Sequence, residues 1–114
     1  MDIPILKQGN CLIASVQPAL TDTGLLQLQE NLLMLTSKYR SHGVIIDVTV
    51  LDVIDSFTSR TLRDTVYMLK LRGAEAVIVG IQPDMAFALV QLGITLEGVK
   101  TALDLEEGLA LLER

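Results

Sequence analysis

The apolar positions of this sequence alternate between the two-residue period of β-strands and the longer period of α-helices. Residues 3–6 and 11–16 are predicted strands, and the turn-forming segment Gln8-Gly9-Asn10 between them favours a hairpin. Residues 44–48 and 76–79 are mostly apolar and β-branched, which is typical of strands covered on both faces. Residues 51–54 continue as an apolar strand segment, and a short edge strand is predicted near residues 99–103.

Four segments have apolar residues at helical spacing and residues that favour the beginning or the end of a helix. Thr21 or Asp22 caps the first, which runs to about Ser41 and has leucines at positions 25, 28, 32 and 35. The second follows Asp55 and Ser56 and ends near residue 72, with an inward stripe at positions 62, 66, 69 and 73. The third begins at a proline and spans residues 83–92, and the last spans residues 104–113.

This order of elements predicts one α/β domain over residues 1–114. Strands that alternate with helices pack into a mainly parallel sheet covered by those helices. We therefore expect a mixed sheet of four or five strands packed with about four helices. In such sheets the binding surfaces lie at the turns that lead from a strand into a helix.

Composition narrows the possible functions. Of the 114 residues 50% are hydrophobic and the net charge is −5, with no basic stripe of the kind that nucleic-acid binding requires. The apolar runs are much shorter than the ~20 residues needed to span a bilayer, and the first residues lack the pattern of a secretion signal. We predict a cytoplasmic protein that binds neither nucleic acid nor membrane.

Residues for catalysis, metals or cofactors are scarce. Cys11 is the only cysteine and is interpreted as a buried strand residue, while His42 is the only histidine and follows a predicted helix. The segment 80–83 lacks the glycines and lysine of a nucleotide-binding loop. Asp47, Asp52 and Asp55 are better explained as a strand residue, a turn residue and a helix cap than as a metal cluster. We predict no enzyme activity, no metal site and no cofactor.

The most informative segment is the turn at residues 53–60. It places Asp55, Ser56, Thr58, Ser59 and Arg60 in what reads as one exposed first helical turn. Helix capping alone accounts for an Asp-Ser pair, because their oxygens accept unpaired backbone N–H groups. The neighbouring residue 57 is a phenylalanine, which we expect to be tucked beneath the turn; exposure would instead indicate a docking site.

A hydroxyl in this turn is also a suitable phosphorylation site. The start of a helix presents N–H donors and a partial positive charge to an anion, and a phosphate adds about −1.5 to −2 charges. Arg60 lies one helical turn after Ser56 and could pair with the phosphate. The fold should therefore survive modification, and binding partners should respond to it.

These residues resemble the STAS domains of bacterial anti-sigma-factor antagonists, in which a Ser or Thr at or near an Asp is phosphorylated. The segments 80–83 and 89–94 are similar to the stressosome branch of that family, and the resemblance covers essentially the whole chain. Phe57 stands where sporulation-type antagonists have a second serine, so Ser56 is the assigned acceptor and Thr58 and Ser59 are lesser candidates. Asp22 is a weak match to the acid that precedes the first helix in those antagonists.

The resemblance implies a non-catalytic scaffold of the RsbS type, since no N-terminal sensor domain of the RsbR type is expected. Such a scaffold self-associates, co-assembles with RsbR-type co-antagonists and holds an RsbT-type serine/threonine kinase. Phosphorylation of Ser56 would release the kinase and a cognate phosphatase would reverse it, with Asp55, Phe57 and Arg60 supporting the site or contacting partners. The alternative is a simpler phospho-regulated antagonist that binds one anti-sigma kinase.

Overall fold

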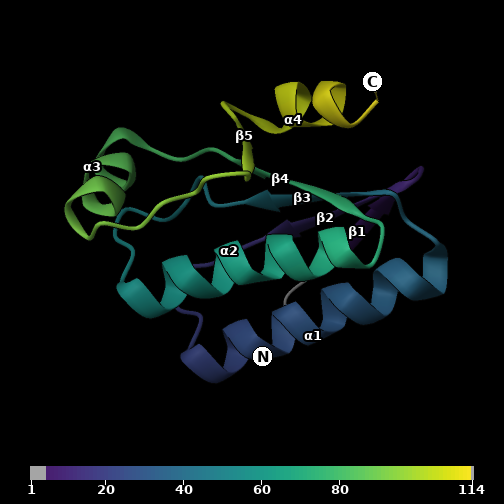
Figure 1. The fold of residues 1–114 in the computed structure, drawn as a ribbon, viewed down its shortest axis with the longest axis horizontal. Coiled ribbons are helices and arrows are strands. Elements are labelled where there is room, and N and C mark those ends of the chain that lie inside the picture. Colours follow the sequence, from purple (N-terminus) through teal and green to yellow (C-terminus); the bar gives the residue numbers. More distant parts are fainter. Residues whose placement is uncertain (1–4, 114) are drawn as a thin grey trace.

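The computed structural model describes residues 5–113, and these form a five-stranded sheet with four helices (Figure 1). The strands are β1 (Ile5–Gln8), β2 (Cys11–Ser15), β3 (Gly43–Asp47), β4 (Glu75–Val79) and β5 (Lys100–Ala102). The helices are α1 (Asp22–Tyr39), α2 (Ser56–Leu71), α3 (Pro83–Gln91) and α4 (Leu105–Leu112). The predicted α/β class and element order are confirmed; positions 3 and 4 of the predicted first strand lie outside the described residues.

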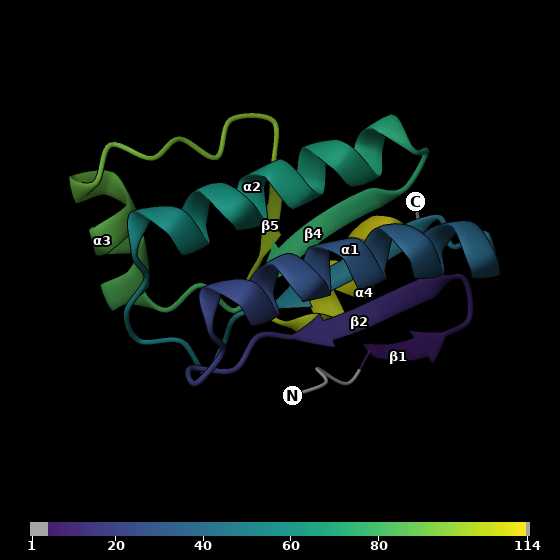
Figure 2. The same cartoon turned by 90° about the horizontal axis from the view of Figure 1, so that it is seen from below.

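The strands lie in the order β1-β2-β3-β4-β5, so each new strand is added to the same growing edge. The β1–β2 pair is the predicted antiparallel hairpin, and the other three pairs are parallel. Figures 1 and 2 show α1 and α2 side by side on one face and α4 on the other, with α3 beyond the end where α1 and α2 begin. All the strand-to-helix turns that precede α1, α2 and α3 therefore lie at one end of the molecule.

The sheet separates two apolar cores, as the alternation within each strand requires. Val44 and Ile46 of β3 face the larger core beneath α1 and α2, whereas Ile45 faces the smaller core beneath α4. The inward positions of α2 are Leu62, Val66 and Leu69, which are all buried. The predicted fourth member of that stripe is wrong, because residue 73 lies beyond the end of α2 and is exposed.

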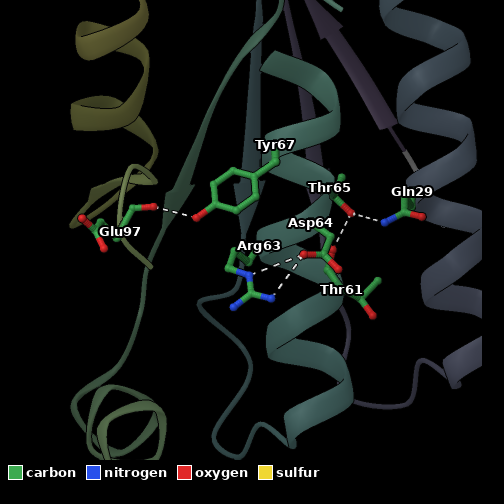
Figure 3. Close-up of polar contacts among 7 residues, drawn as sticks. All are labelled: Gln29, Thr61, Arg63, Asp64, Thr65, Tyr67 and Glu97. Atoms are coloured by element: carbon green, nitrogen blue, oxygen red, sulfur yellow. Dashed lines mark hydrogen bonds and ion pairs between the residues drawn. The ribbon is translucent and has the colours of Figure 1, made fainter. Parts of the chain in front are cut away.

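A polar contact joins the two helices that cover the larger core (Figure 3). Gln29 of α1 donates a hydrogen bond of 2.9 Å to the Thr65 hydroxyl of α2, and that hydroxyl donates to the carbonyl of Thr61 at 2.7 Å. Thr61 and Thr65 are buried, so the pairing satisfies polar groups that would otherwise be costly to remove from water. This contact fixes α2, and with it the turn that precedes α2, against α1.

Gly108 allows α4 to approach the sheet, and this gives a stability prediction. A Cβ atom at Gly108 would lie 2.6 Å from Val79 Cγ1 and 2.9 Å from Ile45 Cδ1. Overpacking lowers the free energy of unfolding by about 1–3 kcal/mol. The higher helix propensity of alanine offsets at most about 1 kcal/mol of this loss. We expect Gly108→Ala to lower the free energy of unfolding by up to ~2 kcal/mol in urea denaturation.

Gly24→Ala in α1 is the matched control. Its added Cβ would meet the tip of the flexible, half-buried Leu20 side chain, at 2.6 Å from Cδ1. The side chain can move, so this substitution should be neutral or slightly stabilising. Equal effects of the two substitutions would contradict close packing of α4.

Candidate switch site at the start of helix α2

The segment between β3 and α2 forms turns, so the strand segment predicted for residues 51–54 is wrong. Asp47 accounts for the break, because its Oδ1 atom accepts hydrogen bonds from the Thr49 backbone N–H at 2.9 Å and from the Thr49 hydroxyl at 2.5 Å. Leu51 and Ile54 are each 5% exposed and anchor the segment to the larger core. The apolar residues that suggested a strand therefore serve as anchors of an irregular loop.

Asp55 is the N-cap of α2, as predicted. Its backbone is extended, with φ −95° and ψ 173°, and its Oδ1 atom accepts a hydrogen bond of 2.7 Å from the Thr58 N–H. Hydrogen bonds from the backbone and the side chain of Thr58 lower the pKa of the Asp55 carboxyl below its ordinary value. The cap is therefore ionised at neutral pH and holds the first helical turn in place.

The hydroxyl groups of this turn differ in their exposure. Ser56 is the first helical residue and is half-buried, as is Thr58. Ser59 is only 1% exposed, and its hydroxyl donates to the Asp55 carbonyl. The expectation of three hydroxyls on one exposed turn is thus wrong for Ser59, which packs inward and is out of reach of a kinase while the turn is folded.

The site also has exposed apolar side chains. Phe57 is 38% exposed, so the expectation that it is tucked beneath the turn is wrong. Val50 and Val53 in the preceding loop are 48% and 81% exposed. We call Val50, Val53 and Phe57 the apolar rim. Neither valine was singled out from the sequence, because Val50 lies between the predicted segments and Val53 was taken as part of an apolar strand segment. The interruption of that segment by Asp52 was a signal that it is irregular.

Charged residues complete the site. Arg60 is exposed, and the ion pairs within residues 5–113 are Arg63–Asp64 and Lys100–Glu75, so its guanidinium has no carboxylate partner there (Figure 3 shows the former pair). Asp22, in the first turn of α1, lines a hollow of about 200 Å³ together with Asp55 and Thr58. The structure thus places Asp22 next to the cap of α2, although the two residues are far apart in the sequence.

The other candidate residues lie away from this turn. Cys11 is half-buried in β2, where burial and then the charge of Glu113 raise the pKa of its thiol. His42 is exposed just before β3. Within residues 5–113 no group of three or more His, Cys, Asp or Glu side chains could hold a metal ion. Across the same residues, none of the helices has both the length and the apolar character needed to cross a bilayer.

The lowered pKa of Asp55 predicts a pH dependence of stability. A carboxyl whose pKa is lower in the folded chain contributes stability that is present above its unfolded pKa and is lost as pH falls through the folded pKa. The ordinary value is 3.8. Asp55→Asn keeps an N-cap oxygen but no ionisable group, so its free energy of unfolding should fall less steeply than that of the wild type below about pH 4. Urea denaturation of both proteins at pH 7 and at pH 3 tests this. An equal loss of unfolding free energy between the two pH values in wild type and Asp55→Asn would contradict it.

A family model described as the STAS domain matches residues 2–108 of this sequence. This chain belongs to the STAS-domain family. RsbS from Moorella thermoacetica, solved with a serine-to-glutamate substitution, has a TM-score of 0.86 and 33% identity to this STAS domain, covering 97% of this chain and 94% of that one. A chain from a structure titled "Molecular architecture of the stressosome, a signal integration and transduction hub" has a TM-score of 0.84 and 34% identity, with 96% of each chain covered.

Curated relatives are similar over a shorter region. The RsbT co-antagonist protein RsbRA of Bacillus subtilis is 35% identical over 83 residues, which are 73% of this STAS domain and 30% of that protein. RsbRC of the same organism is 30% identical over 83 residues, or 29% of its length. The chain therefore spans about a third or less of the length of these relatives, and it matches the two solved structures nearly end to end.

Proposed function

We propose that this STAS domain is a non-catalytic stressosome scaffold that is switched by phosphorylation of Ser56. In this proposal it co-assembles in the cytoplasm with RsbR-type co-antagonists and holds an RsbT-type serine/threonine kinase. That kinase phosphorylates Ser56 and is released, and a cognate phosphatase resets the scaffold. The likeness to RsbS and to RsbR-type relatives supports the stressosome role.

The observation that carries the proposal is the position of Ser56 as the first residue of α2. The Thr58 N–H already binds Asp55, whereas the N–H groups of Ser56 and Phe57 have no acceptor within the described residues. Unpaired N–H groups and the helix dipole favour an anion by about 0.3–1 kcal/mol. Arg60, one turn later, supplies a cation at an exposed position.

The phosphate is expected to act on partners because the fold can accommodate it. A half-buried side chain at the start of a helix has room to place a dianion toward solvent. The apolar rim beside it offers a partner exposed side chains that the fold does not need. Adding a dianion next to such a surface opposes docking, because a partner would have to remove the phosphate from water to reach the rim.

Incubation with a cognate RsbT-type kinase and ATP, followed by phosphosite mapping, tests the acceptor. We expect label on Ser56, loss of label in Ser56→Ala, and retention of label in Thr58→Ala. Label confined to Thr58 or Ser59 would overturn the assignment. Sizing the chain with an RsbR-type partner separates the scaffold from the simpler antagonist, since only the scaffold enters a megadalton particle.

A further inference from the structure

β5 is an edge strand of the sheet, because within residues 5–113 it pairs with β4 alone. The Ala102 carbonyl accepts a hydrogen bond of 3.2 Å from the Gly80 N–H, so the backbone groups of Ala102 point toward β4. Successive residues of a strand direct their backbone groups to opposite sides. The N–H and C=O groups of Thr101 therefore point away from the sheet, where they can pair with a further strand.

A groove of about 540 Å³ extends along this open edge. Thr101 and Ala102 line it, and its walls come from α3, the segment after α3 and the start of α4. Figure 1 shows β5 between α3 and α4. Val90 and Leu103 border the groove and are 80% and 81% exposed. Such a groove offers sites for the side chains of an added strand. The apolar lining residues include Ile81, Leu89, Val90, Ile94, Leu96 and Leu103.

The edge lysine does not block this strand. Proteins often place a lysine or a proline on an edge strand to prevent unwanted pairing. Lys100 forms an ion pair with Glu75 of β4, which draws it back across the sheet, and β5 contains no proline. β5 has only three residues, so an added segment is short and contacts in the groove must supply part of its affinity.

Acidic side chains determine which segment fits the edge. Glu107 lines the groove, and Asp104 and Glu106 are exposed beside it at the start of α4. The dipole of α4 favours acids there, but the ion pairs formed within residues 5–113 involve none of the three. A lysine or arginine on the added segment would supply the missing cation.

We propose that the β5 edge binds an extended segment of a different protein, with apolar side chains at alternate positions and a lysine or arginine at the end beside α4. Its backbone pairs with Thr101, and one row of its side chains fills the groove. A second copy carries the same net charge of −5, which opposes its docking on an acidic surface. The inference goes beyond the switch at Ser56, and its test requires neither kinase nor phosphate.

Hydrogen exchange followed by NMR tests the open edge in the free chain. The Thr101 amide should exchange at the rate of an exposed amide, whereas the Ala102 amide, which points toward β4, should be protected. Equal protection of the two amides would overturn the proposal, because the edge would not be open.

A random peptide library displayed on phage supplies the probe. We expect the selected peptides to alternate β-branched apolar residues with polar ones and to carry a lysine or arginine at one end. When the chain is saturated with the tightest of these peptides, the Thr101 amide should become protected from exchange. Selection of no peptide, or of peptides that leave the Thr101 amide unprotected, would overturn the proposal.

Thr101→Pro tests the backbone pairing. Proline removes the outward N–H but no hydrogen bond to β4, so the variant should still unfold cooperatively. The dissociation constant of the selected peptide, measured by fluorescence anisotropy, should rise at least about tenfold. Thr101→Val keeps the N–H in a β-branched residue and is the matched control, which should bind as the wild type does.

Glu107→Gln is a second variant that leaves the strand unchanged. It keeps the Glu107 backbone N–H that binds the Asp104 cap at 2.9 Å. It should weaken peptide binding and reduce the dependence of binding on salt. An unchanged dissociation constant in Glu107→Gln or in a folded Thr101→Pro would overturn the proposal. Altered sedimentation of Thr101→Pro without peptide would also overturn it, by showing that a second copy occupies the edge. None of these results bears on label at Ser56.

Discussion

A Ser56→Ala chain should bind its kinase as the wild type does and fail to release it when ATP is added. The substitution removes only the Ser56 hydroxyl, which belongs to a half-buried residue and has no hydrogen-bond acceptor among the described residues. The fold of the variant should therefore be intact. In the wild type, phosphorylation should weaken kinase binding at least about tenfold, which corresponds to ~1.4 kcal/mol. In Ser56→Ala the dissociation constant, measured by calorimetry before and after ATP treatment, should not change.

Thr58→Ala is the matched control for this experiment. It removes the neighbouring half-buried hydroxyl and keeps the Thr58 backbone N–H that binds the Asp55 cap. Release should therefore proceed as in the wild type. If Thr58→Ala blocked release and Ser56→Ala did not, the acceptor would be Thr58, and the switch would operate from the third helical residue.

The largest loss of stability is expected from Gly80→Ala, at the turn between β4 and α3. Gly80 has φ +81°, and a Cβ atom there would lie 1.9 Å from Thr49 Oγ1 and 3.0 Å from Thr49 Cα. The left-handed backbone costs a non-glycine residue about 1–2 kcal/mol, and the steric conflict adds about 1–3 kcal/mol. We expect a total loss of about 3 kcal/mol in urea denaturation.

Gly73→Ala separates the two contributions to that loss. Gly73 has φ +86° but no atom within 4 Å of an added Cβ, so only the backbone cost applies there. Its substitution should cost about 1–2 kcal/mol, and the difference between the two variants reports the contact with Thr49. A Gly80→Ala protein no less stable than Gly73→Ala would contradict the close approach of this turn to the loop before α2.

The sequence predicts the elements well because each carries its own local signal. β3 and β4 are β-branched apolar runs, and α1, α2 and α4 begin at residues whose side chains accept N–H groups of the first turn. The end of α2 was predicted correctly, but Gly73 was wrongly included in the buried stripe, because the periodic pattern continues past the last helical residue. The pattern at residues 51–54 was misleading, since anchors of a loop and residues of a strand are both apolar.

The candidate site is predictable in outline, and its exposure is not. Asp55 was predicted to cap α2 from its type and position, and the structure confirms this cap. Ser56 as the phosphorylation site stays a prediction, which rests on its position in the sequence and on the family resemblance. The burial of Ser59 depends on how α2 is rotated against the apolar residues around it, which include Ile54 and Met85. The proximity of Asp22 to Asp55 arises because α1 and α2 begin at the same end of the sheet, which follows from topology and not from either local segment.

The central claim is that the phosphate acts on a docking surface and not on the fold. The most direct test compares the thermal unfolding and the kinase affinity of the phosphorylated and unphosphorylated chain. We predict that stoichiometric phosphate on Ser56 leaves a single cooperative unfolding transition, with the midpoint shifted by no more than a few degrees, and weakens kinase binding at least about tenfold. A phosphorylated chain that loses its cooperative transition, or that binds the kinase as tightly as before, would contradict a switch that acts on a docking surface.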